Sequence, residues 1–234
     1  MVSHIFFDLD RTLWDFETNT AVALEELYYA FEFNKKSSKN VADFIASYRT
    51  HNDFYWDLYL QKKVSREEVR LKRFELTLND LGINDEGLAP KLSEAYINNA
   101  PYQKRLFPGV YETLVWLSEK GYKLTVITNG FLAAQEIKLQ QSGIRSFFDY
   151  LISSEAVGEG KPDPKIFKHA LDLYAVSPEN CLMLGDSFNA DVIGAEGVGI
   201  RGVLFDPHNK APRRTGIEKI EQFSDLKNLL LGIH

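Results

Sequence analysis

Apolar residues along the chain predict an α/β sheet. Five short runs are apolar and rich in β-branched or aromatic residues, at 4–7, 122–128, 150–154, 181–185 and 201–205. Runs that are apolar at consecutive positions are typical of strands covered by helices on both faces, as in parallel sheets. Helical patterns separate the last four runs, so the chain is expected to form a doubly wound, Rossmann-like α/β core.

Glycine and proline mark the ends of the helices between these strands. Two predicted helices, at 110–120 and 131–142, each end directly before a glycine that can take the left-handed conformation. Asp163-Pro164 supplies the residue types favoured at an N-cap and at the first helical position. A polar loop at 206–216 and a helix at 224–231 are predicted to close the chain.

The stretch from 16 to 100 lacks any strand pattern. Apolar residues recur there at helical spacing in four segments, at 20–33, 41–60, 66–81 and 88–97. Ser65 followed by Glu68 has the form of a capping box, and Gly82 is a plausible helix stop. We therefore predict an all-helical cap domain at 16–100, inserted into a core domain formed by 1–15 and 101–234.

Composition narrows the classes of function. The 234 residues suffice for a core domain with an inserted one, and the formal net charge of −6 argues against a general nucleic-acid binder. The one cysteine, Cys181, cannot form an internal disulfide and lies in an apolar run, which fits a buried thiol in a reducing cytoplasm. The first residues show no signal-peptide pattern, and no segment is apolar enough to span a bilayer. We expect a cytoplasmic protein without nucleic-acid or membrane partners.

Polar motifs follow four of the predicted strands. They are Asp8 and Asp10, then Thr128-Asn129-Gly130, then Lys161, and finally Asp186 and Asp191. Each has an ordinary explanation alone, as a helix cap, a tight turn or a solvated lysine. Because the carboxyl ends of parallel strands meet at one edge of a sheet, we expect the motifs to converge on one crevice. Acidic groups there can hold one magnesium ion, and lysine and threonine side chains can hold phosphoryl oxygens.

The motifs DLDRT, Thr128-Asn129, GKPDP and GDSFNAD together resemble the four motifs of the haloacid dehalogenase superfamily. The resemblance covers nearly the whole chain, and the helical insertion resembles that superfamily's cap. Finer features, such as TLWDF after the first motif, are similar to a subfamily of pyrimidine 5'-nucleotidases that includes enzymes for modified nucleotides. The resemblance implies a Mg²⁺-dependent phosphomonoester hydrolase, acting as a monomer or homodimer on a small phosphorylated metabolite such as a (deoxy)nucleoside monophosphate.

The resemblance also implies roles for the motif residues. Asp8 would attack phosphorus to form an aspartyl-phosphate, and Asp10 would protonate the leaving alcohol and then activate water. Magnesium would be held by Asp8, the backbone carbonyl of Asp10, and Asp186. The phosphoryl group would be bound by Thr12, Thr128, Asn129 and Gly130. Lys161 would offset charge on Asp8 and the transferring oxygens, and Asp191 would orient that lysine or a metal-bound water. Arg11 departs from the small or polar residue that the superfamily often has at its position.

Aromatic residues are frequent in the helical insertion. Four of them lie on one helix face, which is more simply a packing seam than a base-stacking site: Phe44, Tyr48, Tyr55 and Tyr59. Residues off that face are the better candidates for substrate contact: Arg49, His51, Asn52 and Phe54. His51 is equally consistent with a solvated surface histidine. Trp14 and Phe16, directly after the first motif, are predicted to form part of a hinge.

Other activities remain open at this point. A 2-haloacid dehalogenase also uses a nucleophilic aspartate and a helical cap, but Asp10 and Asp186 have no evident use in that reaction. A sugar-phosphate phosphatase or a phosphomutase would share the same core groups. A non-catalytic binding module would not need Asp8, Asp10, Lys161 and Asp186 together.

Overall fold

The computed structural model describes residues 1–209 and 216–232, so the predicted loop at 206–216 lies in part outside the described residues. The chain divides into two compact units. One comprises Met1–Phe16 and the chain from Lys104 onward, and we call it the core unit. The other, Glu17–Gln103, is the helical unit.

The core unit is built on a parallel sheet, which confirms the predicted α/β class. Its strand order is β3-β2-β1-β4-β5-β6. The bounds are β1 (His4–Phe7), β2 (Lys123–Thr128), β3 (Tyr150–Ser153), β4 (Cys181–Gly185), β5 (Arg201–Phe205) and β6 (Lys219–Ile220). All five predicted strands form, whereas β6 was missed because two residues leave no recognisable apolar run. The order reverses on either side of β1, and in open α/β sheets ligands bind outside the carboxyl ends of the strands at such a switch point.

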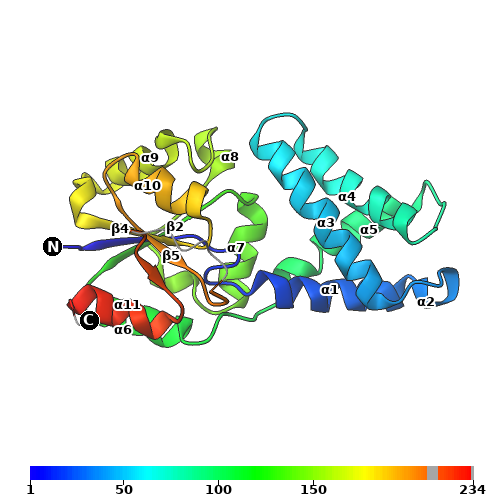
Figure 1. Ribbon diagram of the computed structural model, residues 1–234, viewed down its shortest axis with the longest axis horizontal. Helices are drawn as coiled ribbons and strands as arrows, with labels where there is room; N and C mark the ends of the chain where they lie inside the picture. Colours follow the sequence, from blue (N-terminus) through cyan, green and yellow to red (C-terminus); the bar gives the residue numbers. More distant parts are fainter. Residues whose placement is uncertain (210–215, 233–234) are drawn as a thin grey trace. The chain divides into compact units, whose positions relative to one another are not determined.

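Both faces of the sheet are covered by helices, as consecutive apolar positions predict. Ile5 and Phe7 of β1 pack in one cluster with residues of α6 (Val110–Glu119), α7 (Leu132–Gln141) and α11 (Phe223–Leu231). Phe6 belongs to the opposite cluster, with residues of α9 (Pro164–Tyr174) and α10 (Gly194–Glu196). Figure 1 shows α9 and α10 on one side of the sheet and α6 and α11 on the other. Shorter elements complete the core unit: η2 (Arg145–Phe147), α8 (Ser154–Val157), η3 (Pro178–Asn180) and the π-helical turn η4 (Phe188–Ile193).

The predicted helix signals of the core unit act as expected. Asp163 caps α9, since its carboxylate accepts a 2.8 Å hydrogen bond from the backbone N–H of Lys165, and Pro164 is the first helical residue. Gly121 and Gly143 follow α6 and α7 with φ of 79° and 72°, in the left-handed region that a glycine adopts without strain.

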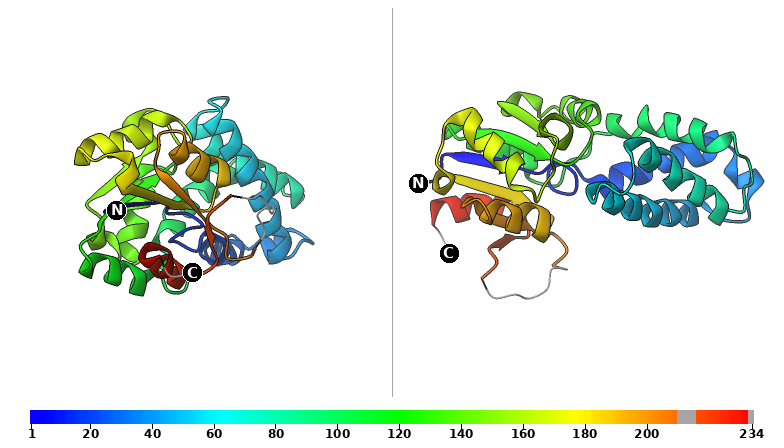
Figure 2. Two further views of the ribbon diagram at one scale, coloured as in Figure 1. Left: turned by 60° about the vertical axis from the view of Figure 1, so that its left-hand side comes forward. Right: turned by 90° about the horizontal axis from the view of Figure 1, so that it is seen from above.

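Every regular element of the helical unit is a helix. They are α1 (Phe16–Ala30), α2 (Phe33–Lys36), α3 (Val41–Leu60), α4 (Arg66–Asp80), α5 (Leu88–Ile97) and η1 (Ala100–Tyr102). Figure 2 shows them packed side by side. The predicted capping box starts α4, because Ser65 and Glu68 exchange hydrogen bonds between side chain and backbone. Phe44 and Tyr48 are fully buried in this unit's own apolar core, as a packing seam requires, whereas Tyr55 and Tyr59 are half-buried.

Among the helices that the structure describes, none combines the length and apolar character needed to cross a membrane.

Candidate active site

Side chains from three strand ends meet at the carboxyl edge of the sheet. Asp8 follows β1, Lys161 lies in the loop after β3, and Asp191 lies in η4 after β4. The ammonium of Lys161 is 2.6 Å from an oxygen of Asp8 and 2.6 Å from an oxygen of Asp191. Both contacts are buried, with the Lys161 side chain 2% exposed. The predicted convergence of Asp8, Lys161 and Asp191 is therefore present in the structure.

Asn129 fixes the loop that carries Lys161. Its amide donates to the Lys161 carbonyl at 2.9 Å and accepts from the Lys161 backbone N–H at 2.7 Å. A Cβ at Gly160 would lie 2.6 Å from the Asn129 side-chain oxygen, so only glycine leaves room for this clamp. The sequence assigned Asn129 to the phosphoryl group. In the structure its side chain is engaged with the lysine loop, and a role in binding the phosphoryl group stays a prediction.

A second glycine, Gly185, leaves room for the side chain of Asp191. A Cβ at Gly185 would fall 2.2 Å from the Asp191 carboxyl carbon, which no side chain tolerates. The second oxygen of Asp191 accepts a 2.9 Å hydrogen bond from the backbone N–H of Ser187. Because one oxygen faces Lys161 and the other faces Ser187, Asp191 is held firmly in one orientation.

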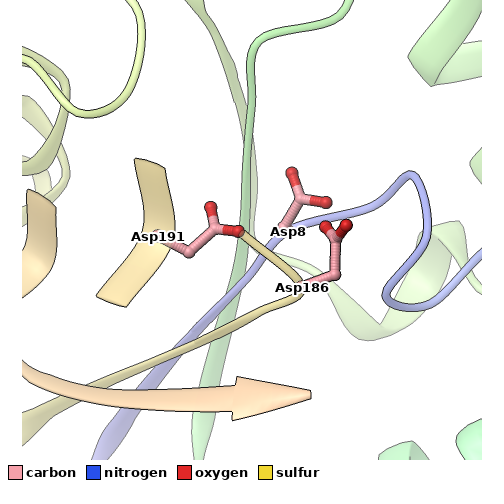
Figure 3. A group of neighbouring side chains, drawn as sticks. All are labelled: Asp8, Asp186 and Asp191. Carbon is pink, nitrogen blue, oxygen red and sulfur yellow. The ribbon is translucent and has the colours of Figure 1, made fainter. Parts of the chain in front are cut away.

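The acidic groups fit a divalent cation. Asp8, Asp186 and Asp191 each offer a carboxylate oxygen, and these atoms all lie within 4.8 Å of one another. Figure 3 shows the three carboxylates converging. The Thr12 hydroxyl lies 3.4 Å from oxygens of both Asp8 and Asp186. Carboxylate oxygens are the ligands that Mg²⁺ prefers in proteins. Both oxygens of Asp191 already face a donor, Lys161 or Ser187, so Asp8 and Asp186 stay the predicted ligands.

The electrostatics show a deficit of positive charge. Burial raises the pKa of Asp8 to about 8, opposed by Lys161 and reinforced by Asp191 and Asp186. Burial and then Asp191 raise the pKa of Asp186 to about 7. Burial lowers the pKa of Lys161, but the facing carboxylates of Asp191 and Asp8 outweigh it and raise it above the ordinary value. The Lys161 ammonium, together with Arg11 acting on Asp186, leaves both carboxyl pKa values raised, and a bound cation would lower them.

Magnesium is therefore expected to stabilise the protein more at alkaline than at acidic pH. The pKa values of Asp8 and Asp186 are raised by folding, so the folded chain binds more protons than the unfolded chain between about pH 4 and 8. Without metal, the unfolding free energy falls as pH rises through that window. Bound Mg²⁺ offsets the charge of the carboxylates once they have lost their protons, so its stabilising effect is larger at high pH. Melting temperatures with Mg²⁺ and with chelator, at pH 5 and pH 8, check this. An equal or larger magnesium shift at pH 5 would contradict it.

Asp10 points to a different set of partners, which the sequence did not reveal. Its carboxylate accepts hydrogen bonds from Lys138 at 2.6 Å and from Gln135 at 3.0 Å, both on α7. The Asp10 side chain is therefore outside the acidic group around Asp8. The metal contact through its backbone carbonyl, which the resemblance implies, stays a prediction.

Thr128, Gly130 and Arg11 also have partners within the core unit. The buried Thr128 hydroxyl donates to Gln135 at 3.2 Å and accepts from the Gly130 N–H at 3.0 Å. Arg11 has a positive φ of 66°, and its guanidinium carbon lies 4.6 Å from the ring centroid of Phe16. Arg11 also lowers the pKa of Asp186, against the larger effect of burial.

The candidate residues of the insertion all lie in the helical unit. Arg49 pairs with the Glu17 carboxylate at 2.9 Å, and His51 contacts Asp80 at 2.8 Å. Phe54 is exposed, with 54% of its surface accessible. Of the four, these three remain accessible or half-accessible in this unit.

Asn52 differs from the sequence expectation. It is buried rather than turned outward, and its oxygen accepts from the Arg73 guanidinium at 2.8 Å. The reason is that Arg73 is itself buried, among the rings of Tyr48, Phe74 and Tyr96, and needs an acceptor. A single sequence gives no sign that an arginine on α4 turns inward.

Known proteins are similar in sequence to this chain over most of its length. A family model described as haloacid dehalogenase-like hydrolase matches residues 2–199. Pyrimidine 5'-nucleotidase YjjG of Escherichia coli (strain K12) is 31% identical over 208 residues, or 88% of this chain and 87% of that protein. A glyceraldehyde 3-phosphate phosphatase of Methanothermobacter thermautotrophicus is 30% identical over 98% of this chain and 100% of that protein.

A solved structure agrees with the fold. The crystal structure of the HAD-hydrolase YfnB from Bacillus subtilis, bound to magnesium, superposes with a TM-score of 0.85 at 26% identity. The superposition covers 99% of this chain and 100% of that chain.

Proposed function

The chain is an enzyme that belongs to the haloacid dehalogenase-like hydrolase family, and on that basis we propose that it hydrolyses phosphomonoesters with the help of Mg²⁺. The observation that carries the proposal is the buried contact of Lys161 with Asp8 and Asp191, with Asp186 close by. This arrangement places the Asp8 carboxylate, a nucleophile, beside the Lys161 ammonium, which can bind phosphoryl oxygens. The magnesium in the YfnB crystal structure supports the metal part of the proposal.

The proposed reaction has two steps. In the first, an oxygen of Asp8 bonds to phosphorus, the ester P–O bond breaks, and a proton passes from Asp10 to the leaving alcohol. In the second, a water oxygen bonds to phosphorus, its proton passes to Asp10, and the bond from Asp8 to phosphorus breaks to release inorganic phosphate. Lys161 offsets the charge on Asp8 and the phosphoryl oxygens throughout. Magnesium, when bound by Asp8 and Asp186, supplies positive charge to the same oxygens.

The leaving alcohol is proposed to be a nucleoside, so that the substrate is a nucleoside 5'-monophosphate. The nucleotidase relative supports this choice. A sugar phosphate is the second candidate, favoured by the glyceraldehyde 3-phosphate phosphatase relative that aligns over its full length. Transfer back to the substrate, as in a phosphomutase, would use the same residues.

The helical unit is proposed to act as the cap that selects the alcohol. The core motifs recognise only a phosphoryl group and a metal, so specificity has to come from elsewhere. Arg49, His51 and Phe54 present polar or aromatic groups that are not fully buried within their unit.

A substrate screen tests the proposal. Purified protein should release inorganic phosphate from pyrimidine nucleoside monophosphates with Mg²⁺, and chelator should abolish the release because the acidic site then lacks its counter-charge. Glyceraldehyde 3-phosphate and hexose phosphates serve as comparison substrates. A strong preference for sugar phosphates over every nucleotide would reject the nucleotidase assignment. No metal-dependent release from any ester would reject phosphatase activity.

A further inference from the structure

Two donors on α7 hold the Asp10 carboxylate. Lys138 lies 2.6 Å from one of its oxygens, and Gln135 donates to the other at 3.0 Å. The two donors are three residues apart, so they lie on the same face of the helix. Both are buried, although glutamine and lysine are residue types that rarely are. Each Asp10 oxygen thus has its own donor.

These donors are built into the site by further contacts. The Lys138 ammonium lies 4.4 Å from the centroid of the Trp14 ring, and the Gln135 side-chain oxygen accepts from the Thr128 hydroxyl at 3.2 Å. A Cβ at Gly130 would lie 2.4 Å from the Gln135 amide nitrogen, so a glycine there is a condition for this placement. Trp14, which follows the first motif, and residues of the second motif therefore contact the pair.

Stability alone does not account for a buried lysine beside a carboxylate. The desolvation cost of such a pair offsets most of its attraction, and an apolar pair of similar size is often as stable. What the arrangement provides is a fixed orientation and a compensating charge for Asp10.

We propose that Gln135 and Lys138 are positioning residues that hold Asp10 as the proton acceptor when water attacks phosphorylated Asp8. The inference deepens the proposed function and rests on it. In this step the water oxygen bonds to phosphorus, the water proton moves to Asp10, and the bond from phosphorus to Asp8 breaks. Lys138 and Gln135 act through their contacts with Asp10 and exchange no proton themselves.

Hydrolysis of p-nitrophenyl phosphate with Mg²⁺ distinguishes the dephosphorylation of Asp8 from its phosphorylation. Nitrophenolate leaves without a proton, so phosphorylation of Asp8 does not need Asp10. That first step governs kcat/KM. Hydrolysis of phosphorylated Asp8 limits kcat once this second step becomes slow. Lys138→Met should lower kcat about tenfold or more, with kcat/KM within about twofold of wild type and a burst of nitrophenolate. Gln135→Met should act in the same direction. Gln140→Met, on the exposed side of α7, is the matched control and should change neither constant.

An equal fall in kcat and kcat/KM, or no fall in kcat, would overturn the inference. Melting curves show whether each variant folds, and Gln135→Met, which retains the ion pair, carries the test if Lys138→Met does not fold. Failure of the proposed function looks different, because the wild-type protein would then release no nitrophenolate with Mg²⁺.

Discussion

Replacing Asp8 by asparagine is expected to lower turnover by at least about 10⁴-fold while the chain still folds. The amide has nearly the shape of the carboxylate but cannot attack phosphorus. Folding should survive because Lys161 keeps its 2.6 Å contact with Asp191, and because the substitution removes one of three close carboxylates. Phosphate release and a melting curve measure both outcomes.

The matched control for this variant is Asp172→Asn. Asp172 lies on α9 and is exposed, so the same chemical change there should leave activity at the wild-type level. Residual activity of Asp8→Asn within about tenfold of wild type would show that Asp8 is not the nucleophile. Loss of folding would show that the buried carboxylate is needed for the structure.

Among the substitutions proposed for this protein, Lys161→Met is expected to lower the unfolding free energy most, and it should also lower activity. The substitution leaves Asp8 and Asp191 buried without their shared cation, and breaking a buried pair in this way costs about 3–5 kcal/mol of unfolding free energy. Activity should fall as well, because no ammonium then offsets charge on the phosphoryl oxygens. Urea denaturation and phosphate release measure the two effects.

The stability loss of Lys161→Met should grow with pH. Without the ammonium, the pKa values of Asp8 and Asp186 in the folded state rise further above the ordinary aspartate value, so the folded variant binds protons that the unfolded chain releases. Its stability therefore falls as pH rises above about 4, where unfolded aspartates ionise. Lys168→Met, at an exposed position of α9, should show no such dependence. A pH-independent loss would mean that the lysine acts through packing.

Much of the core could be predicted from sequence because its signals are local. A strand covered on both faces has to be apolar at consecutive positions, as in 4–7 and 181–185, and the helix ends follow from capping residues such as Asp163. The convergence of Asp8, Lys161 and Asp191 followed from one geometric rule about parallel strands.

The remaining contacts depend on tertiary structure. Gln135 and Lys138 lie on a helix, where polar side chains are usually solvated, and only the fold brings them to Asp10. The same holds for Asn129, whose side chain serves the lysine loop. Asn52 is buried because α4 brings Arg73 against it. Such polar contacts leave no periodic trace in the sequence, since each depends on a partner far along the chain.

The claim that Asp8 becomes phosphorylated during turnover can be measured directly. Asp10→Asn protein is mixed with p-nitrophenyl phosphate and Mg²⁺, quenched in acid and mapped by peptide mass, because this variant should form the aspartyl-phosphate but hydrolyse it slowly. We predict one phosphoryl group on the peptide that contains Asp8, and none in Asp8→Asn. Steady turnover by the wild type, with no phosphorylated peptide in Asp10→Asn or with the group on another residue, would contradict covalent catalysis by Asp8.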